Sequence, residues 1–309
     1  MPDLIPTGHT FVNRWQCEEN DHLNVQFFTA FAHDAGEQLH VALGFGPAAR
    51  SGLGIALVPR EDHIRYHREM REAEALDVHS APVAVDERTL TAFHRLDSHY
   101  TGQTAGTIGS VTSYAFADGR AATLPAAVLD AARRRRADLP DNAKPRGAGA
   151  LGPLPAFQLD RAAGYGLMPI CRDVVKPAEC GADGLLLPRH HFSRFSDGVG
   201  HLWHALGFDR GAMRDRDEGT IVLEMKCVYD RRLRAGDAAI VMSGVAASAE
   251  KTLHIVHYLF NAETGALAAR AEAIGGLFDQ RARRIVAFSD DQRKRLAAGV
   301  ARLPFGQAA

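Results

Sequence analysis

The chain repeats itself at a constant offset of 163 residues, with no gap. The identical pairs include Cys17 with Cys180, Asp34 with Asp197, the run 42–45 with 205–208, Tyr66 with Tyr229, Arg68 with Arg231, Arg71 with Arg234, His94 with His257, and Thr101-Gly102 with Thr264-Gly265. Roughly twenty identities over about ninety positions in one register indicate a duplicated structural unit, because chance gives only scattered matches. Any fold assigned to one half must therefore also suit the other.

Both copies predict the same order of elements. A short extended segment precedes a helix of about twenty residues, and four strand-like runs follow. In the first copy these are expected at Thr10–Gln16, Asn24–Phe45, Gly54–His67, Leu76–Val85, Thr91–Ser98 and Ala105–Phe116. In the second copy they are expected at Val174–Glu179, Pro188–Phe208, Thr220–Arg231, Ala238–Ala247, Thr252–Phe260 and Ala266–Phe278. One helix enclosed by a curved antiparallel sheet, in the order βαββββ, makes each copy an α+β unit.

The segments outside the repeat predict a linker and a terminal helix. The linker has a helical pattern at Pro125–Arg136, followed by a stretch rich in Pro and Gly. Ser289–Leu303 predicts a capped helix with acidic residues early and basic residues late, which suits the helix dipole. The expected divisions are 1–118 for the first unit, 119–160 for the linker with its short helix, 161–288 for the second unit and 289–309 for the terminal helix and tail.

Composition narrows the class of protein. Of the 309 residues, 46% are hydrophobic and 24% are charged, and the formal net charge is −1. This balance argues against nucleic acid or an acidic membrane as a partner. The N-terminus has no basic region followed by an apolar run, and no apolar run is long enough to span a bilayer. The four cysteines form no C-x-x-C pair, which favours reduced thiols. We therefore expect a cytoplasmic protein.

A polar turn enters the first long helix. It reads Glu18-Glu19-Asn20-Asp21-His22-Leu23-Asn24. Carboxylates here would lie beside the free backbone N–H groups of a helix N-terminus, where an anion or a polarised carbonyl is stabilised. A simpler interpretation is that Asn20, Asp21 or Asn24 only caps the helix. The turn by itself leaves both interpretations open.

Together with the later Tyr66-His67-Arg68-Glu69, this turn resembles the hotdog-fold thioesterases of the 4-hydroxybenzoyl-CoA thioesterase-like superfamily. The duplication makes the chain similar to the tandem, double-hotdog form. The resemblance implies two tandem hotdog units, each a long central helix wrapped by a curved antiparallel sheet, which form a pseudo-dimer. It also implies an acyl-CoA thioesterase, a hydrolase that converts an acyl-CoA thioester to the free acid and CoA without a further cofactor. The resemblance is also compatible with a homodimer of double-hotdog chains.

The chain departs from the family pattern in both copies. In the first copy, Glu18 stands where the family usually has Asp, and Asp21 stands where it has Gly. In the second copy, the residues at the positions of Glu18, Asn20, Asp21 and His22 are Gly181, Asp183, Gly184 and Leu185. The second turn thus lacks the acid and the histidine. We expect one working site per chain, in the first copy.

The resemblance also implies roles for individual residues. Glu18 is expected to act as general base or as nucleophile, with Asn20 and His22 orienting water or the thioester. The backbone N–H of Val25 is the expected oxyanion donor. Asn24 either belongs to the site or caps the helix.

Binding of CoA would require positive charge for its phosphates. By type and position, Arg60, Arg65, Arg68 and Arg284 are the candidates. The paired histidines His201 and His204 lie three residues apart on a predicted helix, but no carboxylate or cysteine completes a set of metal ligands. We therefore expect no metal.

Two other functions fit the same residues. A hotdog enoyl-CoA hydratase or dehydratase needs a histidine paired with an acid, and Glu18 with His22 could supply that pair. A non-catalytic acyl-CoA-binding protein would also keep the fold. The sequence does not choose between CoA and an acyl-carrier protein, nor does it identify the acyl group.

Overall fold

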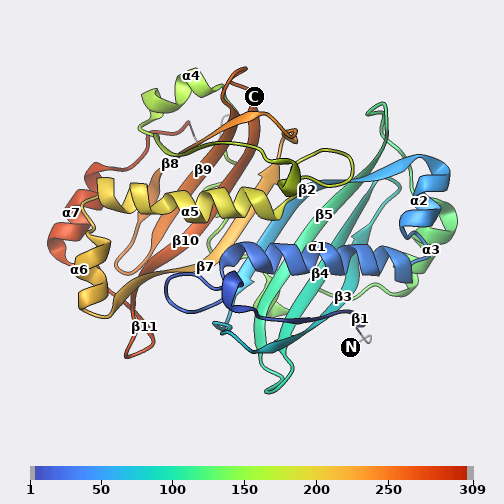
Figure 1. Ribbon diagram of the computed structural model, residues 1–309, viewed down its shortest axis with the longest axis horizontal. Coiled ribbons are helices and arrows are strands. Elements are labelled where there is room, and N and C mark those ends of the chain that lie inside the picture. The colour runs from blue at the N-terminus through green and yellow to red at the C-terminus, as the bar shows by residue number, and fades with distance from the viewer. Residues whose placement is uncertain (1–3, 305–309) are drawn as a thin grey trace. The chain divides into compact units, whose positions relative to one another are not determined.

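A computed structural model describes residues 4–304 of the chain. The chain divides into two compact units, Met1–Lys144 and Pro145–Ala309, and Figure 1 shows a long helix on a sheet in each of them. The division falls inside the linker that was expected at 119–160. Among the described residues, no helix is both long enough and apolar enough to cross a membrane.

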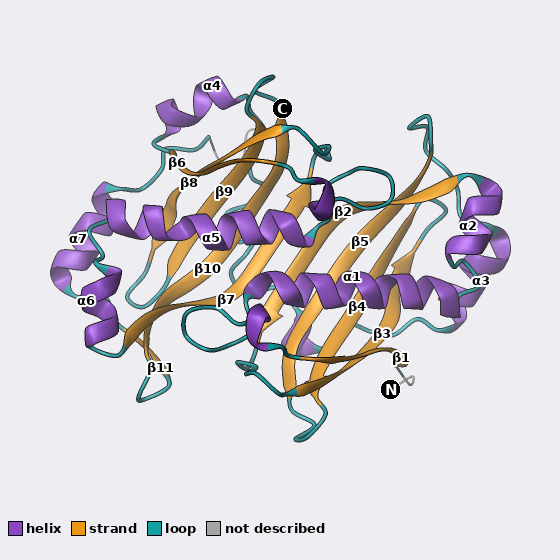
Figure 2. Ribbon diagram, viewed as in Figure 1, coloured by secondary structure: helices purple, strands orange, loops and turns teal. Residues whose placement is uncertain are grey.

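The first unit is an antiparallel sheet packed against one long helix. Its strands are β1 (Ile5–Phe11), β2 (Ile55–Tyr66), β3 (Ala75–Val85), β4 (Thr89–Ser98) and β5 (Thr104–Phe116). They pair in the order β1-β3-β4-β5-β2. The helices are α1 (Val25–Ala42), α2 (Pro47–Leu53) and α3 (Ala126–Arg134). Helix α1 lies across one face of the sheet (Figure 2).

The second unit repeats this plan. Its strands are β6 (Met168–Val174), β7 (Glu218–Tyr229), β8 (Ala238–Ser248), β9 (Leu253–Asn261), β10 (Leu267–Asp279) and β11 (Arg284–Val286). They pair in the order β6-β8-β9-β10-β7, and β11 adds to β10. The helices are α4 (Leu159–Ala162), α5 (Arg189–Ala205), α6 (Arg210–Asp215) and α7 (Asp290–Ala298). The shared pairing order confirms two tandem α+β hotdog units.

The two long helices end alike because they carry the same stop signal. Helix α1 packs Phe28, Ala35 and Leu39 into the core, each no more than 3% exposed. The chain then leaves the helix at Gly44 with φ of 78°, and Gly207 ends α5 with φ of 79°. This left-handed conformation favours glycine. The predicted helices are confirmed, but each ends before its glycine rather than after it.

The leading strands lie earlier in the chain than predicted. β1 and β6 end within the first residues of the expected extended segments, and the rest of each segment contains a short 3-10 turn, at Arg14–Gln16 and Pro177–Glu179. In the first turn, the Gln16 side chain accepts a hydrogen bond from the backbone N–H of Asn13 at 2.8 Å. In the second turn, Glu179 accepts in the same way from Lys176 at 2.9 Å. This local side-chain bond competes with strand pairing and turns the chain toward the long helix.

The helices outside the repeat are also observed. Helix α3 occupies the predicted stretch Pro125–Arg136 and buries Val128, Leu129 and Ala132 against the first unit. Helix α7 begins after Ser289, whose hydroxyl accepts a hydrogen bond from the N–H of Gln292. It ends at Ala298, short of the predicted bound.

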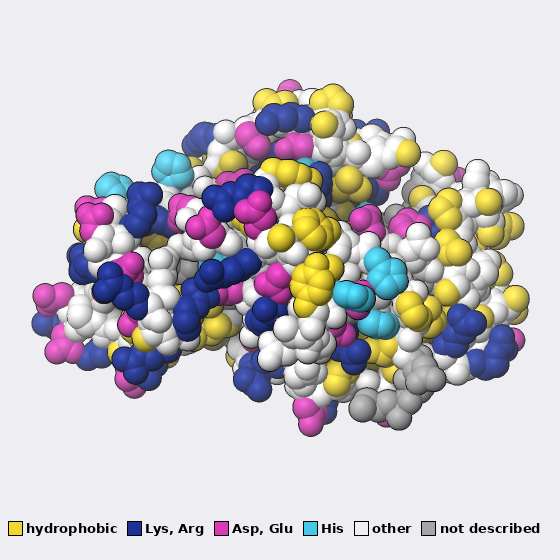
Figure 3. All heavy atoms as spheres, turned by 60° about the horizontal axis from the view of Figure 1, so that its bottom comes forward, with side chains coloured by type: hydrophobic (Ala, Val, Ile, Leu, Met, Phe, Trp, Pro, Cys, Tyr) yellow, Lys and Arg dark blue, Asp and Glu magenta, His cyan; other side chains and the backbone are white. Residues whose placement is uncertain are grey.

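The surface carries mixed charge. Figure 3 shows basic and acidic side chains intermixed over one face. At the end of α3, exposed Arg133 lies 3.7 Å from Asp130, and exposed Arg136 lies 3.9 Å from Asp138. These arginines are exposed and lie near acidic residues, and exposed ion pairs of this kind contribute little to stability.

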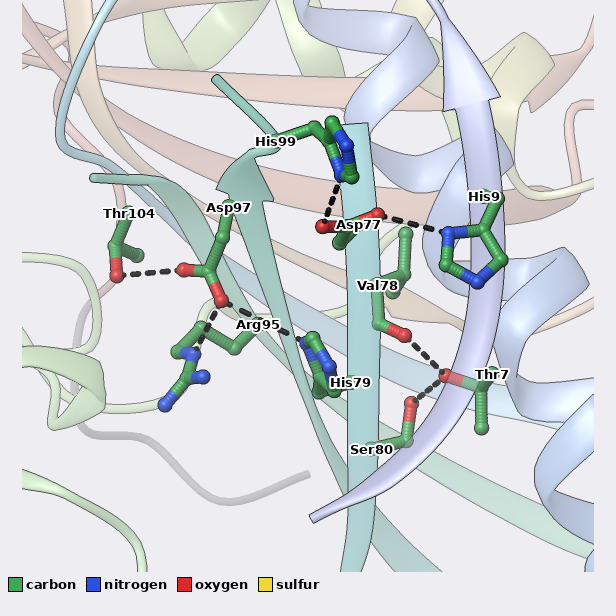
Figure 4. Close-up of polar contacts among 10 residues, drawn as sticks. All are labelled: Thr7, His9, Asp77, Val78, His79, Ser80, Arg95, Asp97, His99 and Thr104. Atoms are coloured by element: carbon green, nitrogen blue, oxygen red, sulfur yellow. Dashed lines mark hydrogen bonds and ion pairs between the residues drawn. The ribbon is translucent and has the colours of Figure 1, made fainter. Parts of the chain in front are cut away.

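A polar network fastens β1 to the edge of its sheet (Figure 4). The hydroxyls of Thr7 and Ser80 lie 2.6 Å apart. The carboxylate of Asp77 accepts hydrogen bonds from His9 at 2.8 Å and from His99 at 2.9 Å. Partial burial acts to raise the pKa of Asp77, but the bonds from His99 and His9 outweigh it and lower that pKa. Side chains thus reinforce the backbone pairing of this edge strand.

Candidate active site

The polar turn is closed by backbone hydrogen bonds. The N–H of Glu18 donates to the carbonyl of His22 at 2.9 Å, and the N–H of Asp21 donates to the carbonyl of Glu18 at 3.0 Å. The N–H of Leu23 donates to the carbonyl of Met70 at 2.7 Å, so the turn is fastened to the segment that follows β2. The chain folds back on itself and presents its side chains at the start of α1.

Glu18 is held by its neighbours in the turn. Its carboxylate accepts hydrogen bonds from the backbone N–H of Asn20 at 3.0 Å and from the Asn20 amide side chain at 2.8 Å. His22 Nδ1 lies 2.9 Å from Glu18 Oε1. The structure therefore brings together three of the predicted residues, Glu18, Asn20 and His22.

A second carboxylate reaches the same histidine. His22 Nε2 lies 3.3 Å from Oε1 of Glu69. The exposed fractions of the Glu18, His22 and Glu69 side chains are 24%, 17% and 18%, so all three are mostly shielded from water. The imidazole is thus bracketed by one carboxylate on each ring nitrogen.

Glu69 was not among the predicted site residues. Its only signal in the sequence is its place in Tyr66-His67-Arg68-Glu69, the second segment that carries the family resemblance. The contact that brings it to the site is the backbone bond from Leu23 to Met70, which joins segments far apart in the chain. Sequence spacing gives no warning of such a pairing.

Asn24 and Val25, at the N-terminus of α1, have different roles. The side-chain oxygen of Asn24 accepts a hydrogen bond from the N–H of Gln26 at 3.1 Å, so Asn24 is the N-cap of α1. Among residues 4–304, no group accepts a hydrogen bond from the N–H of Val25. That donor, at the positive end of the helix dipole, is available to a substrate oxygen.

Asp21 points away from this group. Its φ of 62° is left-handed, a conformation that Asp tolerates better than most residues and that explains the glycine usual in the family. Its exposed carboxylate lies 3.1 Å from Arg14. The carboxylate of Asp21 therefore belongs to the surface.

Of the four predicted arginines, exposed Arg284 begins β11 of the second unit, and the three in the first unit are engaged by protein groups. Exposed Arg60 donates to the hydroxyl of Ser113 at 2.6 Å. Arg65 is buried and donates to the carbonyl of Asn142 in the linker at 2.7 Å. Half-buried Arg68 lies next to Glu69 in the chain and donates to Glu74 at 2.8 Å. The arginines have different partners, and Arg68 is the one that adjoins Glu69 in the chain.

The corresponding turn of the second unit has the same backbone. The N–H of Gly181 donates to the carbonyl of Leu185 at 2.9 Å, and the N–H of Leu186 donates to the carbonyl of Leu233 at 2.8 Å. Gly184 adopts φ of 71° at the position of Asp21. The two turns therefore share their hydrogen bonds residue by residue.

Its side chains differ at every chemical position. Arg232 stands at the position of Glu69 and contacts Asp183, which stands at the position of Asn20, at 2.6 Å. Pro188 stands at the position of Val25 and has no backbone N–H. The second turn thus has neither the Glu18 acid nor the His22 imidazole, and it also lacks the backbone N–H that was expected to be the oxyanion donor.

No metal site accompanies either turn. Within the part of the chain that the structure describes, no three His, Cys, Asp or Glu side chains could hold a metal ion. All four cysteines have free thiols.

Solved structures share this fold at low sequence identity. A protein described as an oleoyl thioesterase from Lactobacillus plantarum is 12% identical, with a TM-score of 0.68 over 89% of this chain and 96% of that one. An acyl-ACP thioesterase from Bacteroides thetaiotaomicron is 13% identical, with a TM-score of 0.62 over 87% and 96%. The 12:0-ACP thioesterase from Umbellularia californica is 12% identical, with a TM-score of 0.62 over 87% and 92%. These likenesses support the double-hotdog fold.

The sequence itself matches a family model in both copies. The search of curated proteins found no match to this sequence. The model of the thioesterase-like superfamily matches residues 12–141 and again residues 175–296. The two matches cover most of the chain and contain both polar turns. The chain therefore belongs to the thioesterase-like superfamily.

Proposed function

We propose that the protein hydrolyses an acyl-CoA thioester to the free acid and CoA at the turn of the first unit. The observation that carries this proposal is the bracketed histidine, with Glu18 on Nδ1 and Glu69 on Nε2, in the turn that leads into α1. The first N–H of that helix, on Val25, has no acceptor among residues 4–304. Ester-type hydrolysis needs a base for water and a donor for the oxyanion, and this group offers both.

In the proposed reaction, Glu18 takes a proton from water while the water oxygen attacks the thioester carbonyl. The negative charge that develops on the carbonyl oxygen is stabilised by the N–H of Val25. Collapse of the tetrahedral intermediate breaks the carbon–sulfur bond, and the proton held by Glu18 passes to the leaving thiolate. Asn20 and His22 hold the Glu18 carboxylate in position through their hydrogen bond and close contact.

Direct attack by Glu18 is the other form of the same reaction. Glu18 would then form a mixed anhydride with the acyl group, and water would cleave it in a second step. A single turnover in ¹⁸O-labelled water separates the two forms. If water attacks the thioester directly, label enters the product acid in the first turnover. If Glu18 attacks and water then cleaves the anhydride at the Glu18 carboxyl carbon, the first product acid carries an unlabelled Glu18 oxygen and the label stays on Glu18.

We assign the phosphates of CoA to arginines near the turn. Arg68 is favoured because it adjoins Glu69 in the chain, and it would exchange its contact with Glu74 for the phosphate. Arg60 and Arg65 would have to exchange their bonds to Ser113 and to the linker carbonyl. Arg68→Ala should therefore raise KM for an acyl-CoA more than Arg60→Ala does.

The decisive test is release of free thiol from a panel of acyl-CoAs by Glu18→Gln. We expect kcat to fall by about 10² to 10⁴ for the best substrate, because the variant cannot accept a proton. Glu19→Gln is the matched control, an exposed carboxylate one residue away. Near-full turnover by Glu18→Gln would refute the assignment.

The close pair of Glu18 and His22 keeps a hydratase or dehydratase as the second candidate. These enzymes need a paired acid and histidine, and the two groups lie 2.9 Å apart. The same panel distinguishes the reactions. A change in enoyl absorbance without thiol release would favour the hydratase, and CoA binding without any turnover would favour a binding protein.

A further inference from the structure

An exposed tryptophan stands at the rim of the first turn. Trp15 is 71% exposed, although burial of its ring would be favourable. It lies in the 3-10 turn Arg14–Gln16, three residues before Glu18. A large apolar side chain left in water beside a reactive turn is more informative than a scattered surface leucine.

Trp15 is fixed to the helix that provides the oxyanion donor. Its ring meets Phe27 edge to face, with centroids 5.6 Å apart, and Phe27 is 7% exposed in the first turn of α1. The carbonyl of the neighbouring Gln16 accepts the N–H of Asn24 at 2.9 Å, directly before Val25. The indole is therefore held at a defined place close to the expected position of the thioester.

The second unit has no such aromatic pair. Ala178 stands at the position of Trp15, and His190 stands at the position of Phe27. The 3-10 turn and the long helix are nevertheless present there. The fold does not need the tryptophan, which occurs only beside the turn that keeps the chemical residues.

A thioester substrate has an acyl chain on one side of the sulfur–carbonyl bond and a thiol-side arm on the other. The exposure of Trp15 favours contact with the thiol-side arm. The acyl chain is apolar and gains by leaving water. The thiol-side arm of CoA ends in phosphates that must stay hydrated or paired, so this arm has to leave the site toward solvent. A ring that is 71% exposed three residues from Glu18 is available to an arm that runs out to solvent.

We infer that Trp15 is the platform for the thiol-side arm of the substrate, the pantetheine chain that CoA and carrier proteins share. The methylene and dimethyl groups of pantetheine pack on the indole face while its amides remain hydrated. This inference rests on the proposed thioester hydrolysis and names the residue that recognises the leaving group.

The kinetic test uses one acyl group on three thiols: CoA, pantetheine and N-acetylcysteamine, which lacks the outer part of the arm. Trp15→Ala should raise KM about tenfold for the CoA and pantetheine thioesters, the loss expected for one buried aromatic contact, and leave kcat unchanged. KM for the N-acetylcysteamine thioester should not change. Trp15→Phe should restore most of the affinity, because it keeps an aromatic face.

The binding test uses fluorescence. The chain has two tryptophans, and the other, Trp203, is 2% exposed. In a Trp203→Phe variant all tryptophan emission comes from Trp15. Free CoA and free pantetheine should both shift that emission to shorter wavelength and protect the ring from acrylamide.

Several results would overturn the inference. A KM effect that grows with acyl-chain length would place the acyl group on Trp15, and a response to CoA without one to pantetheine would place the nucleotide there. An emission that depends on protein concentration and ignores CoA would mean that a second copy covers the ring. If CoA shifts the emission but no thioester is hydrolysed, the proposed hydrolysis fails and the binding inference stands.

Discussion

The two polar turns share one backbone and differ in almost every side chain. In both, the first and fifth residues are joined by a 2.9 Å hydrogen bond, and the sixth is bound to the segment after the second strand of its unit. The first turn carries Glu18 and His22, whereas the second carries Gly181 and Leu185. The backbone of the turn therefore forms without the side chains of Glu18 and His22. This comparison favours a chemical role for these two side chains over a structural one.

The helices that follow the turns differ in a complementary way. The second unit buries Arg194 of α5, 3% exposed, against Glu179 at 2.7 Å and Asp173 at 3.0 Å. The corresponding positions of the first unit are Phe31, Gln16 and Thr10. In the first unit, α1 therefore carries the apolar Phe31 at this position. In the second unit, α5 carries Arg194, which is stabilised by two carboxylates. The same position of the long helix is thus filled by an apolar side chain in the first unit and by an ion-paired arginine in the second.

The largest expected effect comes from breaking that charge cluster. Arg194→Met should lower the free energy of unfolding by about 3 kcal/mol, because Glu179 and Asp173 would be left without their buried partner. Urea denaturation followed by circular dichroism measures the loss. The matched variant replaces all three residues with their first-unit counterparts, as Arg194→Phe, Glu179→Gln and Asp173→Thr, and should recover most of the stability. Equal losses in the two variants would contradict the explanation.

Removal of the oxyanion donor is expected to have the next largest effect. Val25→Pro deletes the N–H at a position where the second unit carries Pro188 and still forms its helix. We expect kcat to fall by about 10² to 10³, the cost of one oxyanion donor, with the melting temperature nearly unchanged. Val25→Ala keeps the N–H and is the control. If Val25→Pro and Val25→Ala are equally active, the N–H of Val25 has no catalytic role.

Loss of the second carboxylate should have a smaller effect. Glu69→Gln keeps the shape of the side chain but removes the negative charge from Nε2 of His22, and we expect kcat to fall about tenfold. The pH profile of kcat/KM should also move, which loss of packing alone would not cause. Glu72→Gln, an exposed residue nearby, serves as the comparison. An unchanged pH profile would remove Glu69 from the site.

The smallest expected effect is on stability in acid. Burial acts to raise the pKa of Glu179, but hydrogen bonds from Arg194 and the N–H of Lys176 outweigh it and lower that pKa. Glu179 therefore contributes stability above about pH 4.3, its ordinary value, and that contribution is lost as the pH falls through the lower folded value. Glu179→Gln places the first-unit residue there and should flatten the dependence of the urea midpoint on acid pH. A midpoint that falls as steeply as in the unchanged protein would disprove this role.

Much of the architecture followed from local pattern. The repeat predicted two like units, and the apolar spacing of α1 and α5 predicted both long helices. The errors were at the boundaries. β1 and β6 were placed too late because the extended stretches before each turn contain 3-10 turns closed by Gln16 and Glu179, a local bond that alternation of apolar residues does not reveal.

By itself, the sequence determined the duplication, the α+β class and the difference between the two turns. These depend on residues near one another in the chain, or on a register that comparison of the copies exposes. Only the tertiary structure decided that Glu69 meets His22 and that Arg65 donates to the linker. It also showed that Trp15 stays in water. The physical reason is that such contacts join segments distant in sequence, where pairing depends on strand order and side-chain direction.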